Sequence, residues 1–122
     1  MFTKLVLISF ILTILTSYAI GDKLTISQTQ TSSWSVNGQP FTVWEAKVTN
    51  TGSRIIYDAT IIGESNLELE NIWSLEQKSS NKFSFPKFIS QNSGLKNGTY
   101  FTFGYINKSS QSAIFSVCDI IN

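Results

Sequence analysis

The chain has 122 residues, with nine Lys and Arg, eight Asp and Glu and no histidine, so its formal net charge is +1. This length suits one domain, and a near-neutral chain without a basic cluster is a poor candidate for binding nucleic acid. Without histidine the chain lacks the usual catalytic base and the commonest metal ligand, so we expect no cofactor and no metal site.

The first residues have the pattern of a signal peptide. Lys4 supplies the positive charge before an apolar run over residues 5–15, and residues 17–19 (SYA) match a small-x-small cleavage site. The apolar run is short for a bilayer span, and Ser9 and Thr13 interrupt it. These features predict a cleaved signal peptide rather than a membrane anchor.

We therefore divide the chain into a signal peptide, residues 1–19, and a single module, residues 20–122. Removal of Lys4 with the signal peptide brings the net charge from +1 to zero. We expect the mature protein to be secreted, to lie in a cell wall or extracellular matrix, and to have no membrane attachment after cleavage.

Alternation of apolar and polar residues, with many β-branched side chains, predicts strands rather than helices after the signal segment. In chain order the expected strands are 24–35, 41–50, 55–62, 82–85, 100–106 and 113–118. A looser region marked by Leu67, Leu69, Ile72 and Leu75 lies between the third and fourth strands, and a polar loop covers residues 92–98. Many short strands separated by turn residues predict an all-β fold, an antiparallel β-sandwich of the immunoglobulin or fibronectin kind.

The dipeptide Asn37-Gly38 predicts a two-residue hairpin, because both positions of such a turn require positive φ. This register places Trp34 opposite Phe41 on one face of the hairpin. Farther along the second strand that face carries Glu45 and Lys47, so we expect Trp34 and Phe41 to be exposed.

Trp44 has the opposite parity and shares its face with Ala46 and Val48, so we expect it in the core. Leu24 and Ile26 have the same parity as Trp34, although they too are expected in the core. The first strand must therefore contain a bulge or a bend.

Aromatic residues are more numerous than a small core needs. They concentrate in residues 83–89 and 100–106, where charge is almost absent, and Trp34, Trp44 and Trp73 add to them. Surplus rings on a surface with few charges suit a neutral, ring-shaped ligand such as a sugar. Polar residues near the candidates are Gln28, Gln30, Ser32, Gln39 and Asn92.

Five segments, in this order, resemble carbohydrate-binding module family 49. They are residues 33–38 (SWSVNG), 48–53 (VTNTGS), 72–75 (IWSL), 83–89 (FSFPKFI) and 101–106 (FTFGYI). The resemblance implies a β-sandwich that binds cellulose, as in modules at the end of some plant endoglucanases and in secreted proteins of cellulose-making amoebae. The chain resembles the stand-alone kind.

The resemblance also implies which rings contact the sugar: Trp34, Phe41, Trp73 and Phe88. Phe41 and Phe88 stand where the family more often has tyrosine or tryptophan, so their stacking is expected to be weaker. Ser74 stands where glycine is common. The expected partner is a polysaccharide, cellulose.

Two other functional classes compete with this interpretation. An enzyme would need two opposed carboxylates, and the available ones are Glu64, Glu68, Glu70 and Glu76. Glu68 and Glu70 would lie side by side on one strand face rather than across a cleft, so we do not expect catalysis. The alternative is an extracellular immunoglobulin-like structural or adhesion domain that binds another protein through an aromatic interface.

Two covalent modifications follow from a secreted context. Asn97 and Asn107 begin N-glycosylation sequons, each where a turn is expected. Cys118 is the single cysteine, so an intrachain disulfide is excluded. Cys118 is interpreted either as a half-buried thiol on the last strand or as one half of an intermolecular disulfide.

Overall fold

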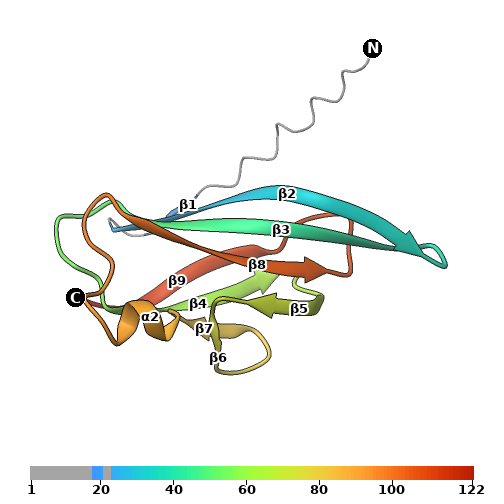
Figure 1. The fold of residues 1–122 in the computed structure, drawn as a ribbon. Helices are drawn as coiled ribbons and strands as arrows, with labels where there is room; N and C mark the ends of the chain where they lie inside the picture. Colours follow the sequence, from blue (N-terminus) through green and yellow to red (C-terminus); the bar gives the residue numbers. More distant parts are fainter. Residues whose placement is uncertain (1–17, 21–22) are drawn as a thin grey trace, which may run out of the picture.

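Strands dominate the part of the chain that the computed structural model describes, residues 18–20 and 23–122 (Figure 1). The first sheet has the strand order β1-β2-β3-β8-β5 and the second has the order β6-β7-β4-β9. All strand pairs within them are antiparallel. The predicted all-β sandwich is confirmed.

The strands of the first sheet are β1 (Tyr18–Ile20), β2 (Leu24–Val36), β3 (Gln39–Asn50), β5 (Leu69–Trp73) and β8 (Tyr100–Asn107). Those of the second sheet are β4 (Asp58–Ser65), β6 (Glu76–Gln77), β7 (Lys82–Ser84) and β9 (Ile114–Ile121). One helical turn, α2 (Lys87–Ser90), follows β7. The predicted signal peptide lies outside the described residues except for its last two, Tyr18 and Ala19, which begin β1. None of the described helical segments is long and apolar enough to cross a membrane.

The third strand and the region after it differ from the prediction. Ile56 forms only an isolated bridge to Leu95, so β4 begins at Asp58 rather than at residue 55. Residues 69–73, predicted as irregular, form strand β5 with a bulge between Leu69 and Asn71. The bulge allows Leu69 and Ile72, three positions apart, both to pack against the core, and this removes the alternation that identifies a strand.

The core lies between the two sheets and is rich in aromatic rings. Two edge-to-face pairs join segments far apart in the chain, Phe85 with Phe101 and Phe103 with Phe115. The fully or nearly buried apolar residues include Leu24, Ile26, Trp44, Ala46, Val48, Ile61, Phe83, Phe85, Phe101, Phe103, Tyr105 and Phe115. Most rings of the two aromatic segments therefore fill the core, and only a minority remain for the surface.

A buried polar cluster links the sheets beneath these rings. The Tyr105 hydroxyl donates to Gln28 Oε1 and accepts a hydrogen bond from the Ala113 N–H at 3.0 Å, and Gln28 Nε2 donates to the Ala113 carbonyl at 2.9 Å. Burial raises the pKa of Tyr105 well above its usual range, and the hydrogen bond from Ala113 offsets part of this increase. Gln28 was expected beside the surface aromatics. It is instead a core residue that accepts the hydrogen bond of the buried Tyr105 hydroxyl.

Two fully buried asparagines end the central strands of the first sheet. Asn50, at the end of β3, donates to the carbonyls of Arg54 and Leu95 and accepts a hydrogen bond from the Gly52 N–H. Asn107, at the end of β8, donates to the carbonyls of Asn66 and Gln111 and accepts a hydrogen bond from the Glu68 N–H. These amides tie the loops to opposite ends of the sandwich.

Cys118 is half-buried on β9, where it pairs with Thr60 of β4, as expected for a thiol on the last strand. Partial burial, and then the neighbouring Asp119 carboxylate, raise the pKa of this thiol. The intermolecular disulfide remains a prediction.

Candidate functional site

The candidate site lies on the outer face of the first sheet, the side that points away from the second sheet. Register places the following residues on that face: Ser27, Thr29, Ser32 and Trp34 from β2; Phe41, Val43, Glu45, Lys47 and Thr49 from β3; Tyr100, Thr102, Gly104 and Ile106 from β8; and Trp73 from β5. Rings, hydroxyls, one carboxylate and one ammonium group share this face.

Trp34 and Phe41 form the first aromatic feature of the outer face. They are directly opposite in the β2–β3 ladder, with ring centroids 5.5 Å apart and ring planes 7° apart. The turn beyond them has positive φ at both Asn37 and Gly38, as the sequence predicted. The expected bulge lies between Gln30 and Ser32, and it moves Trp34 from core parity to the outer face.

This pair sits on a projection of the sheet. The last β3–β8 pair is Thr42 with Asn107, so the hairpin beyond Thr42 continues as two strands alone (Figure 1). The hairpin also has a shallow depression of about 400 Å³, lined by Trp34 and Phe41 together with polar residues that include Gln30, Ser33, Ser35 and Ser110. Trp34 is 43% exposed, so part of its ring is open to a ligand.

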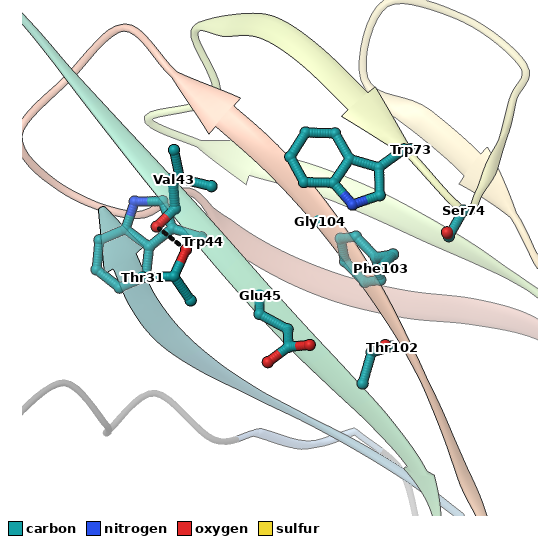
Figure 2. A pocket seen from close by; sticks show the side chains of 9 residues that line it. All are labelled: Thr31, Val43, Trp44, Glu45, Trp73, Ser74, Thr102, Phe103 and Gly104. Carbon is teal, nitrogen blue, oxygen red and sulfur yellow. Dashed lines mark hydrogen bonds between the residues drawn. The ribbon is translucent and has the colours of Figure 1, made fainter. Parts of the chain in front are cut away.

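Trp73 is the second aromatic feature, and its position depends on Gly104. Trp73 pairs with Gly104 of β8, and its indole lies directly over that glycine (Figure 2). A Cβ at residue 104 would lie 2.4 Å from Cε2 and Cζ2 and 2.5 Å from Nε1 of Trp73. The glycine therefore lets the ring lie against the strand, with one face on the backbone and the other free. Trp73 remains 42% exposed.

The backbone conformation of the turn after Trp73 explains why glycine is common at position 74, where this chain has serine. Ser74 has φ +68°, in the left-handed region that glycine adopts at little cost. The preference for glycine that the resemblance implies therefore has a conformational basis, and Ser74 adopts the same turn with some strain.

Beside Trp73 lies a groove of about 210 Å³ (Figure 2). Its lining residues are Thr31, Val43, Trp44, Glu45, Trp73, Ser74, Thr102, Phe103 and Gly104. Glu45 is exposed, pairs with Gly104 and lines the groove, with its carboxylate directed away from the indole (Figure 2). Among the described residues no lysine or arginine lies within 4.0 Å of Glu45, which leaves its oxygens free to accept hydrogen bonds from a ligand.

The structure brings three of the four predicted rings onto one face. Trp34, Phe41 and Trp73 all lie on the outer face of the first sheet. Phe88 is 60% exposed, but it belongs to α2, which lies toward the end of the molecule opposite the β2–β3 hairpin (Figure 1). Phe88 is therefore separated from the Trp34–Phe41 pair, and its role in binding stays a prediction.

Sequence reasoning placed Glu45 on this face but missed three residues of β8, Tyr100, Thr102 and Gly104. One signal was present: a glycine within an aromatic strand often marks the close approach of another group. The partner of Gly104 could not be named, because Trp73 lies in the segment whose strand was not recognised.

The carboxylates considered for catalysis do not gather on this face. Glu64 lies on β4 of the second sheet and accepts a hydrogen bond from the Ser116 hydroxyl. Glu70 lies on β5, 3.8 Å from Lys108. Within residues 18–20 and 23–122 there is also no group of three or more His, Cys, Asp or Glu side chains that could hold a metal ion.

The two sequon asparagines differ sharply in exposure. Asn97 is exposed in the loop before β8 and donates to the Gly52 carbonyl. Asn107 is 0% exposed, and its Nδ2 donates to the carbonyls of Asn66 and Gln111 at 2.8 and 2.9 Å. A glycan on Nδ2 would displace both bonds, so the packing of Asn107 argues against its predicted modification.

Exposed rings with a free face, next to hydroxyl and carboxylate groups on a rigid sheet, can bind the apolar face of a sugar while polar groups contact its hydroxyls. A β-sandwich with such a face is typical of carbohydrate-binding modules. The family model "Carbohydrate binding domain CBM49" matches residues 24–110, and the chain belongs to that family. Comparison with curated proteins and with solved structures finds no further match.

Proposed function

We propose that this protein is a secreted, non-catalytic module that binds cellulose through the outer face of its first sheet. The observation that supports this most directly is the Trp73 indole, which lies over Gly104 with its outer side open. Cellulose is a linear β-1,4-glucan whose equatorial hydroxyls leave both faces of each glucose ring lined by C–H groups. Such a chain suits flat rings that are exposed on one face of a sheet.

The size of each contact indicates that several rings must act together. Burial of apolar surface contributes about 25 cal/mol per Å², so one ring face supplies only a modest part of the affinity. Trp34, Phe41 and Trp73 share one face, and they can contact the same polysaccharide chain or surface. Secretion is proposed from the N-terminal signal pattern, and Asn97 is the better candidate for a glycan because it is exposed.

The test is a pull-down of the purified protein with microcrystalline cellulose, amorphous cellulose, chitin and starch. We expect retention on cellulose and weaker retention on the others, with Trp73→Ala and Trp34→Ala each reducing the bound fraction. Tyr57→Ala is the matched control, because Tyr57 is 41% exposed but lies before β4, outside the outer face. Wild-type protein that stays entirely in the supernatant with both celluloses would contradict the proposal.

Secretion has its own test. Expression of the full chain in a eukaryotic host, followed by N-terminal sequencing of protein from the medium, should give a chain that begins close to Ile20. Full-length protein retained in the cells would contradict this part of the proposal without affecting the cellulose experiment.

A further inference from the structure

Tyr100 is a large exposed ring on the outer face that no predicted site includes. It is 55% exposed and begins β8, where it pairs with Thr49 of β3. Register without shifts runs from this pair to the pair of Glu45 with Gly104, so Tyr100 and Trp73 lie on the same side of the sheet.

The three aromatic features recur at equal intervals along β3. Trp34 stacks on Phe41; Trp73 lies over Gly104, the partner of residue 45; Tyr100 is the partner of residue 49. Each interval is four residues, about 13 Å at 3.3 Å per residue, so the row is about 26 Å long. It begins over β2 and β3 and shifts toward β8, so it is inclined to the strands.

Lys47 contacts the Tyr100 ring. Its Nζ lies 4.3 Å from the centre of the ring, within the range of a cation–π contact. Tyr100 nevertheless remains 55% exposed, so ring surface is left for a ligand.

Hydroxyl groups accompany the row. Thr25, Ser27 and Thr29 of β2 have outer-face parity, and they pair with Thr49, Lys47 and Glu45 of β3. Thr102 lies between Tyr100 and Gly104 on β8. These groups can donate to or accept from sugar hydroxyls between the rings.

We propose that Tyr100 is a third stacking position and that the preferred ligand is an extended linear glucan that lies along β3, from the hairpin to the end near Asn50. This inference rests on the proposed function and adds a direction, a length and a residue to it. It also distinguishes Tyr100 from Phe88, which has similar exposure but lies on α2 rather than on the outer face.

The experiment measures affinity for cellobiose through cellohexaose by titration calorimetry or NMR. Wild-type affinity should rise through the series, because only the longest chains reach from Phe41 to Tyr100. Tyr100→Ala should weaken binding of cellohexaose about fivefold, which corresponds to the loss of roughly 40 Å² of stacked ring surface. Binding of cellobiose, which can occupy Trp73 alone, should be unchanged.

Two variants make the result specific. Tyr100→Phe keeps the ring and should retain wild-type affinity for cellohexaose, whereas Tyr57→Ala, at an exposed ring outside the outer face, should bind every chain length as wild type does. A folded Tyr100→Ala protein with unchanged affinity for cellohexaose overturns the inference, as does a Tyr57→Ala variant that loses the length dependence. If wild-type protein binds none of the oligosaccharides and neither insoluble cellulose, the proposed function itself fails, which is a different outcome.

Discussion

The two faces of the first sheet use the same strands for different purposes. On the inner face Trp44 is 7% exposed, and its Nε1 donates to the Thr42 hydroxyl at 2.8 Å, while Phe103 packs edge-to-face on Phe115. On the outer face Trp34 and Trp73 keep more than a third of their surfaces in water. The inner rings are enclosed on all sides, and the outer rings rest on a neighbour or on the backbone with one side free. Enclosure indicates a stabilising role, and a free side indicates a binding role.

The tryptophans provide the largest expected contrast. Trp44→Ala should lower the free energy of unfolding by about 3–5 kcal/mol, because it leaves a large cavity between the sheets. Trp34→Ala should cost less than about 1 kcal/mol and should weaken cellulose binding instead. Denaturant unfolding and pull-downs on both variants decide this. The face assignment would be inverted if Trp34→Ala unfolded the domain while Trp44→Ala melted normally and lost binding.

Buried Asn107 and exposed Asn97 offer the same contrast between polar side chains. Asn107→Ala should cost about 2–3 kcal/mol, because the carbonyls of Asn66 and Gln111 and the Glu68 N–H lose their partner. The exposed control, Asn97→Gln, should change stability by less than about 0.5 kcal/mol. Peptide mapping of protein secreted by a eukaryotic host should find a glycan at Asn97 and none at Asn107. A glycan on Asn107 in folded protein would contradict the buried position.

A substitution at Gly104 tests whether binding requires the Trp73 ring to lie flat against β8. Gly104→Ala places a Cβ 2.4 Å from the Trp73 ring, which must lift away from β8, so we expect about fivefold weaker cellulose binding and altered tryptophan fluorescence. The matched control is Gly63→Ala on β4, whose Cβ would meet Leu67 Cδ2 at 2.5 Å and which lies on the second sheet. That variant should lose stability and keep its affinity. Equal loss of binding in both would show a general structural effect.

Ser74 permits a smaller change in the same region. Ser74→Gly removes the cost of a left-handed conformation, at φ +68°, but adds entropy to the unfolded chain. We expect a net gain of about 0.5 kcal/mol in unfolding free energy, with binding unchanged. Ser80→Gly, in an exposed segment without positive φ, should give no gain. A loss of stability at Ser74 would show that its side chain has a role of its own.

Salt should have the smallest effect of all. Of the described residues that the β3–β8 register places on the outer face, the charged ones are Glu45 and Lys47, and the main features of the face are rings. Binding to cellulose should therefore change less than about twofold between low and moderate ionic strength. A loss of most binding over that range would indicate a charged ligand. It would contradict the inference that binding depends on the exposed rings of the outer face.

Much of the fold could be predicted from the sequence because local patterns specify it. The Asn37-Gly38 turn fixes the register of β2 and β3, and this register correctly separates exposed Trp34 from buried Trp44. The parity conflict with Leu24 and Ile26 correctly required a bulge. Strand β5 was missed because its own bulge breaks the alternation, and the start of β4 was misplaced because Ile56 is buried by contacts outside any strand.

The sequence by itself determined that the chain is all-β, which family it resembles, and which hairpin carries the Trp34–Phe41 pair. These properties depend on residues close together in the chain, where turn chemistry and side-chain parity are sufficient. Only the tertiary structure decided that Trp73 lies over Gly104, that Tyr100 continues the same row, that Phe88 lies apart from the Trp34–Phe41 pair, and that Gln28 and Asn107 are buried. Each of these depends on which distant strands become neighbours, and pairing between distant strands is set by burial of the whole core rather than by any local pattern.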